Sequence, residues 1–130
     1  MPSVSNGLLA TMADRLLPIW SERGELRDAQ AVANLLRFDF GEIATASRVP
    51  RSKVRLQGQI PAALREQLFQ WAVLLELVAR FFEGDADKTA AWFNTPNHLL
   101  GGLEPRLYIL YGRASKLRDI IDHALLENEQ

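Results

Sequence analysis

The stretch that decides the fold reads AWFNTPNHLLGGLEPRLYILYG and occupies residues 91–112. An amphipathic run leads into it and stops at Pro96, because proline lacks a backbone donor and disfavours helix in the residue before it. Two glycines then allow backbone angles that other residues avoid, and Pro105 suits the first turn of a new helix. The sequence therefore predicts a helix, a compact turn that keeps Leu99 and Leu100 close to the core, and a second helix.

Six residues at fixed offsets within this stretch form a specific pattern: Trp92, Pro96, Asn97, Leu100, Gly102 and Pro105. Together with Gly112, Leu117 and Ile121 further on, the pattern resembles the C-terminal domain of the Xre/MbcA/ParS antitoxins, which bind RES-type toxins. The resemblance covers residues 68–126 well and residues 39–68 more loosely. The alternative is that these residues are only helix-ending turn chemistry, which any helical protein uses.

The resemblance implies an antitoxin of a bacterial type II toxin–antitoxin pair. In that family the toxin has a RES domain and depletes cellular NAD, while the antitoxin blocks access to the NAD pocket and represses its own promoter through a helix-turn-helix. Carried over to this chain, the toxin-binding residues are the six signature residues together with Arg106 and Arg113. The chain departs from the family at its end, where Leu126, Glu127 and Asn128 stand in place of the usual glycine.

The overall composition is typical of a soluble globular chain. The chain has 130 residues, of which 48% are hydrophobic and 24% charged, enough for one ordinary domain or two small helical lobes that share a core. It has no apolar run of about eighteen residues that could span a membrane, and its start does not resemble a secretory signal. The absence of cysteine excludes disulfides and thiol chemistry and fits a reducing compartment. We therefore expect a cytoplasmic protein.

Charge is distributed unevenly along this chain of net charge −1. No acidic residue occurs between Ile43 and Arg65, whereas acidic residues gather at residues 83–87 and near the C-terminal end. The interval contains the basic residues Arg48, Arg51, Lys53, Arg55 and Arg65. This local basic block favours an anionic partner even though the whole chain is nearly neutral.

Residues 28–56 are a candidate helix-turn-helix, in which two short helices are joined by a tight turn. Asp39 can cap the first helix, and Pro50 can start the second, which would run through Arg55. In such a unit the second helix enters the major groove with its N-terminal residues nearest the bases. Base contacts would then come from Arg51, Ser52 and Arg55, and phosphate contacts from Arg48 and Lys53.

Two observations keep the alternative of a solvated helix pair open. The second helix would be short, and short helix pairs are common in proteins that do not bind DNA. Members of the resembling family also often place a tryptophan soon after the recognition helix, whereas this chain has Leu56, Gln57 and Gly58 there.

Apolar residues recur at helical spacing over much of the chain, and we predict an all-α fold of about seven helices. The first pattern covers residues 8–20 and is disturbed near Leu17 by Pro18. A long pattern over residues 62–83 is apolar over most of its circumference, so this helix is either central to the fold or shared with a partner. We divide the chain into an N-terminal helix-turn-helix lobe (1–60) and a C-terminal helical toxin-binding lobe (61–130).

The sequence offers no catalytic constellation. Asp119 and His123 lie four residues apart and could share a helix face, but they supply two metal ligands where a zinc site needs three or four. No nucleophile elbow and no phosphate-cradling glycine loop with lysine is found. We expect no enzyme activity, no metal site and no cofactor.

The expected function is therefore that of an antitoxin that neutralises a RES-domain toxin by blocking its active site and binds its own promoter DNA. A palindromic operator requires a dimer, so we expect a homodimer or a hetero-oligomer with the toxin. Two alternatives remain: a stand-alone helix-turn-helix regulator without a toxin, and an interaction module that no longer binds DNA. Aromatic anchors for a protein partner would come from Trp71, Trp92, Tyr108 and Tyr111.

Overall fold

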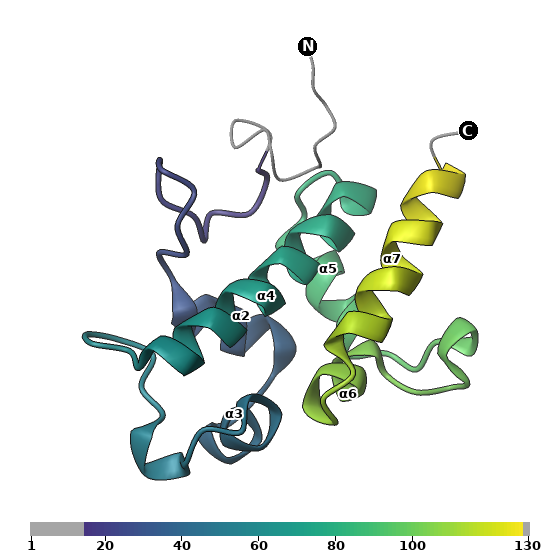
Figure 1. Ribbon diagram of the computed structural model, residues 1–130. Helices are drawn as coiled ribbons and strands as arrows, with labels where there is room; N and C mark the ends of the chain where they lie inside the picture. Colours follow the sequence, from purple (N-terminus) through teal and green to yellow (C-terminus); the bar gives the residue numbers. More distant parts are fainter. Residues whose placement is uncertain (1–14, 129–130) are drawn as a thin grey trace.

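A computed structural model describes residues 15–128, and over this range the protein is all-helical and contains no strand (Figure 1). The predicted all-α class is confirmed. The α-helices are α2 (Ala29–Leu36), α3 (Phe40–Ser47), α4 (Ala62–Ala79), α5 (Ala86–Phe93), α6 (Pro105–Leu110) and α7 (Ala114–Asn128). Single turns of 3₁₀ helix form η2 (Arg51–Lys53), η3 (Arg80–Phe82) and η4 (His98–Leu100).

Helix α4 is the central element of the fold. It crosses the middle of the molecule in Figure 1, and α2, α3, α5 and α7 all pack against it. Residues 71–79 are buried without exception, which explains why this helix is apolar around most of its circumference. One hydrophobic cluster joins Leu36 and Ile43 from the first part of the chain to Ile109 and Leu117 from the last part. The two halves of the chain therefore share a single core.

The predicted helix at residues 8–20 is wrong over the part that the structure describes. Residues 8–14 lie outside the described range, and residues 15–20 form turns instead of a helix. Pro18 is one reason, because it cannot donate a helical hydrogen bond.

Glu76, a buried residue of α4, is the second reason. Its carboxylate accepts hydrogen bonds from the main-chain nitrogens of Leu16 and Leu17 and, at 3.0 Å, from the indole Nε1 of Trp20. A buried carboxylate is costly unless such donors surround it. The segment before α2 is thus held against α4 by tertiary contacts that local periodicity does not reveal.

The cap predicted at Asp39 is confirmed for α3, and Asp28 caps α2 in the same way. Asp28 accepts a hydrogen bond from the main-chain nitrogen of Ala31 at 3.0 Å, and Asp39 accepts one from Glu42 at 2.7 Å. The Glu42 carboxylate in turn accepts a hydrogen bond from the main-chain nitrogen of Asp39, which completes a capping box. Both helices end on an arginine with positive φ, Arg37 at 56° and Arg48 at 61°.

The prediction of a second helix in the helix-turn-helix, from Pro50 through Arg55, is wrong. Only η2 forms there; Val54 after it has an extended backbone, and residues 56–59 form bends. The side chains of Val54 and Leu56 are both buried, whereas Arg55 between them is exposed. Burial of alternate residues requires an extended backbone, because the side chains of such a segment point to opposite sides in turn.

Candidate functional site

Asn97 organises the turn between α5 and α6. Its side-chain oxygen accepts a hydrogen bond from the main-chain nitrogen of Leu99 at 2.9 Å, and its main-chain nitrogen donates to the carbonyl of Leu103 at 3.0 Å. Its carbonyl accepts bonds from the nitrogens of Leu100 and Gly102, both at 2.9 Å. Gly102 has a φ of 84°, which favours glycine. These four hydrogen bonds of one residue fix the shape of the turn.

Most of the signature residues support this turn from within. Leu100 is 4% exposed and belongs to the core, and Pro105 is buried at the first position of α6. Trp92 is partly buried and lies edge-on to Phe93, with ring centroids 5.0 Å apart. Pro96 is exposed beside them. The pattern that carries the family resemblance therefore contains residues that build the turn as well as residues that face outward.

Leu99 does not lie near the core, contrary to the prediction. It is 68% exposed, and Leu103 on the other side of the turn is 45% exposed. Successive side chains of a 3₁₀ turn point in different directions, so Leu99 and Leu100 cannot both face inward. Tyr111, one of the predicted anchors, is also exposed, whereas Trp71 is 1% exposed and packs edge-on against Phe38 in the core.

An apolar groove opens beside this turn, between α5, α7 and η3. Its deeper part is a cavity of about 290 Å³ whose lining is almost entirely apolar. A shallower hollow of about 340 Å³ adjoins it and shares Phe82, Trp92 and Asn97 with it. The lining of the deeper part consists of Phe81, Phe82, Trp92, Asn97, Leu99, Leu100, Ile120, Ile121 and Ala124, and Pro96 and Lys88 line the hollow.

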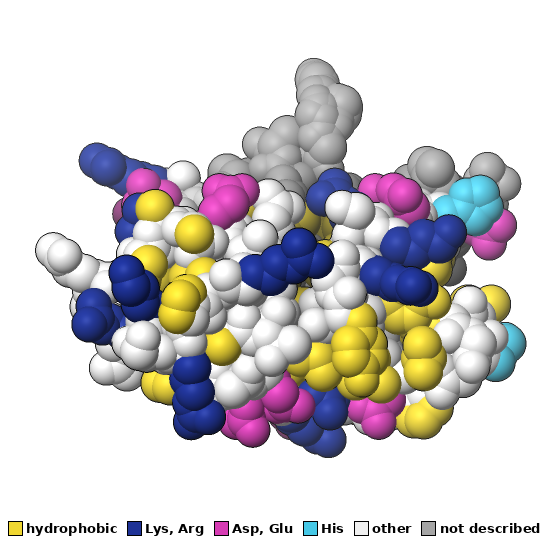
Figure 2. All heavy atoms as spheres, turned by 60° about the horizontal axis from the view of Figure 1, so that its bottom comes forward, with side chains coloured by type: hydrophobic (Ala, Val, Ile, Leu, Met, Phe, Trp, Pro, Cys, Tyr) yellow, Lys and Arg dark blue, Asp and Glu magenta, His cyan; other side chains and the backbone are white. Residues whose placement is uncertain are grey.

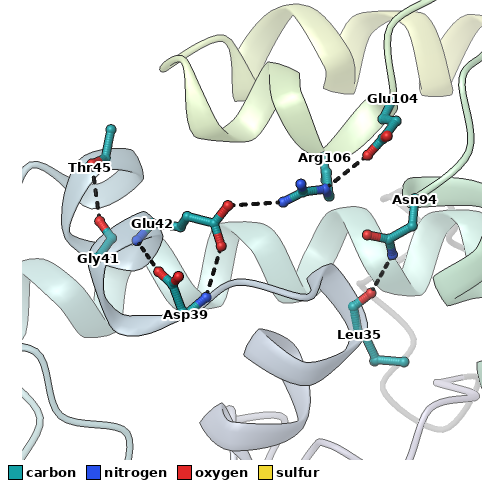
Figure 3. A network of polar contacts seen from close by, with 8 residues as sticks. All are labelled: Leu35, Asp39, Gly41, Glu42, Thr45, Asn94, Glu104 and Arg106. Atoms are coloured by element: carbon teal, nitrogen blue, oxygen red, sulfur yellow. Dashed lines mark hydrogen bonds and ion pairs between the residues drawn. The ribbon is translucent and has the colours of Figure 1, made fainter.

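Arg106, a predicted toxin-binding residue, is engaged within the chain (Figure 3). Its Nε donates to Glu104 at 3.0 Å, and its Nη1 lies 3.4 Å from the carboxylate of Glu42 on α3. Its guanidinium also lies 5.8 Å from the centre of the Phe38 ring. The side chain is 20% exposed. Arg106 therefore ties α6 to α3, whereas Arg113, the other predicted arginine, is exposed.

A second polar contact in Figure 3 ties α5 to α2. The side-chain nitrogen of Asn94 donates to the carbonyl of Leu35 at 2.9 Å and to that of Ala90 at 2.7 Å. Together with the Arg106 contacts, it fixes the base of the turn against the first part of the chain.

The predicted DNA-binding residues all lie on the surface. Arg48 ends α3, Arg51, Ser52 and Lys53 form η2, and Arg55 follows in the extended segment. Within residues 15–128 none of their four basic side chains takes part in an ion pair. The structure places them at the end of α3, on the single turn η2 and in the extended segment after it, instead of on a recognition helix.

Comparisons of the chain with protein-family models, with curated proteins and with solved structures find no match. Function therefore has to be argued from the residues themselves. Between residues 15 and 128 no helix is long and apolar enough to cross a membrane, and no three potential metal ligands gather. Two surfaces remain as candidates: the apolar groove with its exposed leucines, and the basic residues around η2.

Proposed function

We propose that the chain is an antitoxin that binds a RES-domain toxin through the apolar groove and the exposed leucines beside it. The observation that carries the proposal is the pair Leu99 and Leu103, both exposed on a rigid turn next to an apolar groove. Contiguous exposed apolar surface of this kind marks a protein interaction site. The resemblance of the signature residues to the Xre/MbcA/ParS antitoxins supplies the identity of the partner.

In this proposal the mechanism is occlusion. The chain covers the NAD pocket of the toxin and performs no chemistry of its own. Leu99, Leu103 and Tyr111 provide apolar anchors at the centre of an interface that should bury about 1,600 Å² in total. The hydrogen bonds of Asn97 hold Leu99 and Leu103 in place before binding, which reduces the entropy lost on association.

The proposal also states where in the cell the chain acts and in which oligomeric state. An antitoxin must meet its toxin where NAD is depleted, so we place the chain in the cytoplasm. It acts there as a homodimer or in a hetero-oligomer with the toxin.

Co-expression with the product of the adjacent reading frame tests the neutralising role. We expect the neighbour alone to arrest growth, and the chain to restore growth and co-purify with it. Leu99→Ser should weaken rescue and co-purification, because it removes an exposed apolar anchor. Phe40→Ser is the control, since Phe40 is also an exposed apolar residue, 42% exposed on α3, and does not line the groove. A harmless neighbour that does not bind the chain contradicts the proposal.

A second role at promoter DNA is favoured by a separate observation. Arg48, Arg51, Lys53 and Arg55 are exposed together, and the interval from Ile43 to Arg65 has no acidic residue. We propose that these residues bind DNA and allow the chain to regulate its own promoter. Salt-dependent binding of the upstream DNA without any toxin would support this role. If the chain also fails to bind or neutralise its neighbour, the stand-alone regulator becomes the better description.

A further inference from the structure

A polar cleft of about 560 Å³ lies between the end of α3, the middle of α4 and the start of α7. Two arginines from elements far apart in the sequence line it, Arg48 at the end of α3 and Arg118 in α7. Gln67 and Gln70 of α4 and Ser115 of α7 add uncharged polar groups. The cleft is thus quite unlike the apolar groove on the other side of α7.

Arg48 connects this cleft to the basic residues of η2. A Cβ placed on Gly112 would lie 3.7 Å from its Nη2, so the Arg48 guanidinium reaches the loop that leads into α7. That loop and the first turns of α7 carry Arg113, Lys116 and Arg118. We name as the basic band Arg48, Arg51, Lys53, Arg55, Arg113, Lys116 and Arg118.

Figure 2 views the molecule from the side on which α3 and α6 lie. Dark-blue side chains lie across the middle of this face, and the magenta side chains lie toward its upper and lower edges, where further dark-blue ones stand among them. The whole chain has a net charge of −1, so this separation of charge is a property of the fold. It gathers on one face basic residues that are about sixty positions apart in the sequence.

Four carboxylates lie close to the band and reduce its charge only in part. One is Asp39: a Cβ placed on Gly41 would lie 3.3 Å from Asp39 Oδ1 and 3.4 Å from Arg51 Nη1, so this carboxylate lies beside a member of the band. Asp119 lines the cleft, Asp122 pairs with Nε of Arg118 at 3.0 Å, and Glu66 accepts a hydrogen bond from Gln70. The side chains of Arg118 and Asp122 are each about two-fifths exposed, so solvent screens the ion pair between them. Seven basic side chains against four carboxylates leave the surface positive.

We propose that the basic band is one continuous surface for the phosphate backbone of duplex DNA, and that the start of α7 belongs to it. The inference rests on the proposed DNA-binding role and extends it beyond residues 48–55. A repeated, closely spaced negative charge is the ligand that a long positive band fits best, and duplex DNA carries one charge per about 1.7 Å of its axis.

The local structure explains why backbone contacts should dominate. η2 is a single turn and offers no helix for the major groove. The N-terminus of α3 is capped by the carboxylates of Asp39 and Glu42, which repel phosphates. Contacts to phosphate contribute affinity and salt dependence but carry no sequence information. We therefore expect the basic band to contribute a similar share of the affinity for duplexes of different sequence, promoter DNA included.

Salt-dependent binding to a short fluorescent duplex of scrambled sequence tests the inference. The full chain is titrated by fluorescence anisotropy at several KCl concentrations, with Lys116→Gln/Arg118→Gln as the test variant. If both residues neutralise phosphates, the slope of log K against log salt becomes shallower by about 2. Arg23→Gln/Lys88→Gln removes the same charge from exposed positions outside the band and should leave the slope unchanged.

A third variant, Arg51→Gln/Lys53→Gln/Arg55→Gln, tests DNA binding by residues 48–55 separately from the extension of the surface to α7. If this variant weakens binding while Lys116→Gln/Arg118→Gln behaves like the control pair, DNA binding stands and the extension to α7 is overturned. If the unchanged protein does not bind duplex DNA at low salt, both are overturned, and the neutralisation test is unaffected. Tighter binding to a single-stranded RNA of equal length would overturn the choice of partner.

Discussion

The two turns that carry the candidate sites are built on opposite principles. The turn around Asn97 is specified locally, because one side chain, two glycines and a proline each satisfy a particular backbone requirement. The segment after α3 lacks such signals, and its conformation is decided by the burial of Val54 and Leu56 in a core that other helices supply. The first turn presents apolar side chains on a rigid frame, and the second presents charges on a surface. Rigid apolar surface suits a defined protein partner, whereas a group of exposed positive charges suits a polyanion.

Removing the core residue of the first turn should have the largest effect. Leu100 is buried beside exposed Leu99, so Leu100→Ala leaves a cavity and should lower the free energy of unfolding by about 3 kcal/mol. Leu99→Ala is the matched control and should change stability by less than about 0.5 kcal/mol. Urea unfolding followed by circular dichroism measures both. Equal losses of stability in the two variants would contradict the structure, in which Leu100 is buried and Leu99 is exposed.

This contrast between neighbouring leucines also marks how far the sequence can predict the fold and the site. Proline, asparagine and aspartate act on their own neighbours, so the turn near residue 96 and the caps Asp28 and Asp39 are predictable. Leu99 and Leu100 look alike in the sequence, and only the direction imposed by η4 separates them.

The remaining errors have a common origin in long-range contacts. Glu76 accepts bonds from a segment about sixty residues away and replaces the helix expected there. The sequence around Arg106 does not reveal its ion-pair partner Glu42, because Glu42 lies far away in the chain, in α3. Arg48 and Arg118 line the same cleft only because the chain folds, so their proximity likewise cannot be predicted from their positions in the sequence.

Breaking the Arg106 contacts should have the next largest effect. Arg106→Met keeps the apolar stem but leaves Glu42 and Glu104 without their cation, so we expect a loss of about 1.5 kcal/mol, part of which should disappear at high salt. Arg113→Met removes an exposed arginine seven positions on and should leave stability nearly unchanged. Thermal unfolding at low and high salt measures both. A destabilised Arg113→Met with an unaffected Arg106→Met would reverse the assigned roles.

A change at Gly102 should be smaller and purely local. A Cβ at this position would meet nothing within 4 Å, so Gly102→Ala tests the positive φ of 84° alone. We expect a loss of about 1 kcal/mol in urea unfolding. Partner binding should also weaken, because Leu99 and Leu103 are held by the same turn. An unchanged stability would show that the turn is less tightly specified than its hydrogen bonds indicate.

The smallest change in stability should come from the second turn, and it has the opposite sign. Arg37 and Arg48 end α2 and α3 with positive φ, an unfavourable conformation for arginine, so glycine at either site should stabilise the chain by about 0.5 kcal/mol. Arg37 is exposed outside the basic band, whereas Arg48 lines the polar cleft. Arg37→Gly and Arg48→Gly thus match in backbone effect and in charge, and only Arg48→Gly should weaken duplex DNA binding. Because both proteins should be at least as stable as the unchanged chain, a loss of binding cannot be ascribed to unfolding. Equal DNA affinity of the two variants would remove Arg48 from the proposed DNA-binding surface.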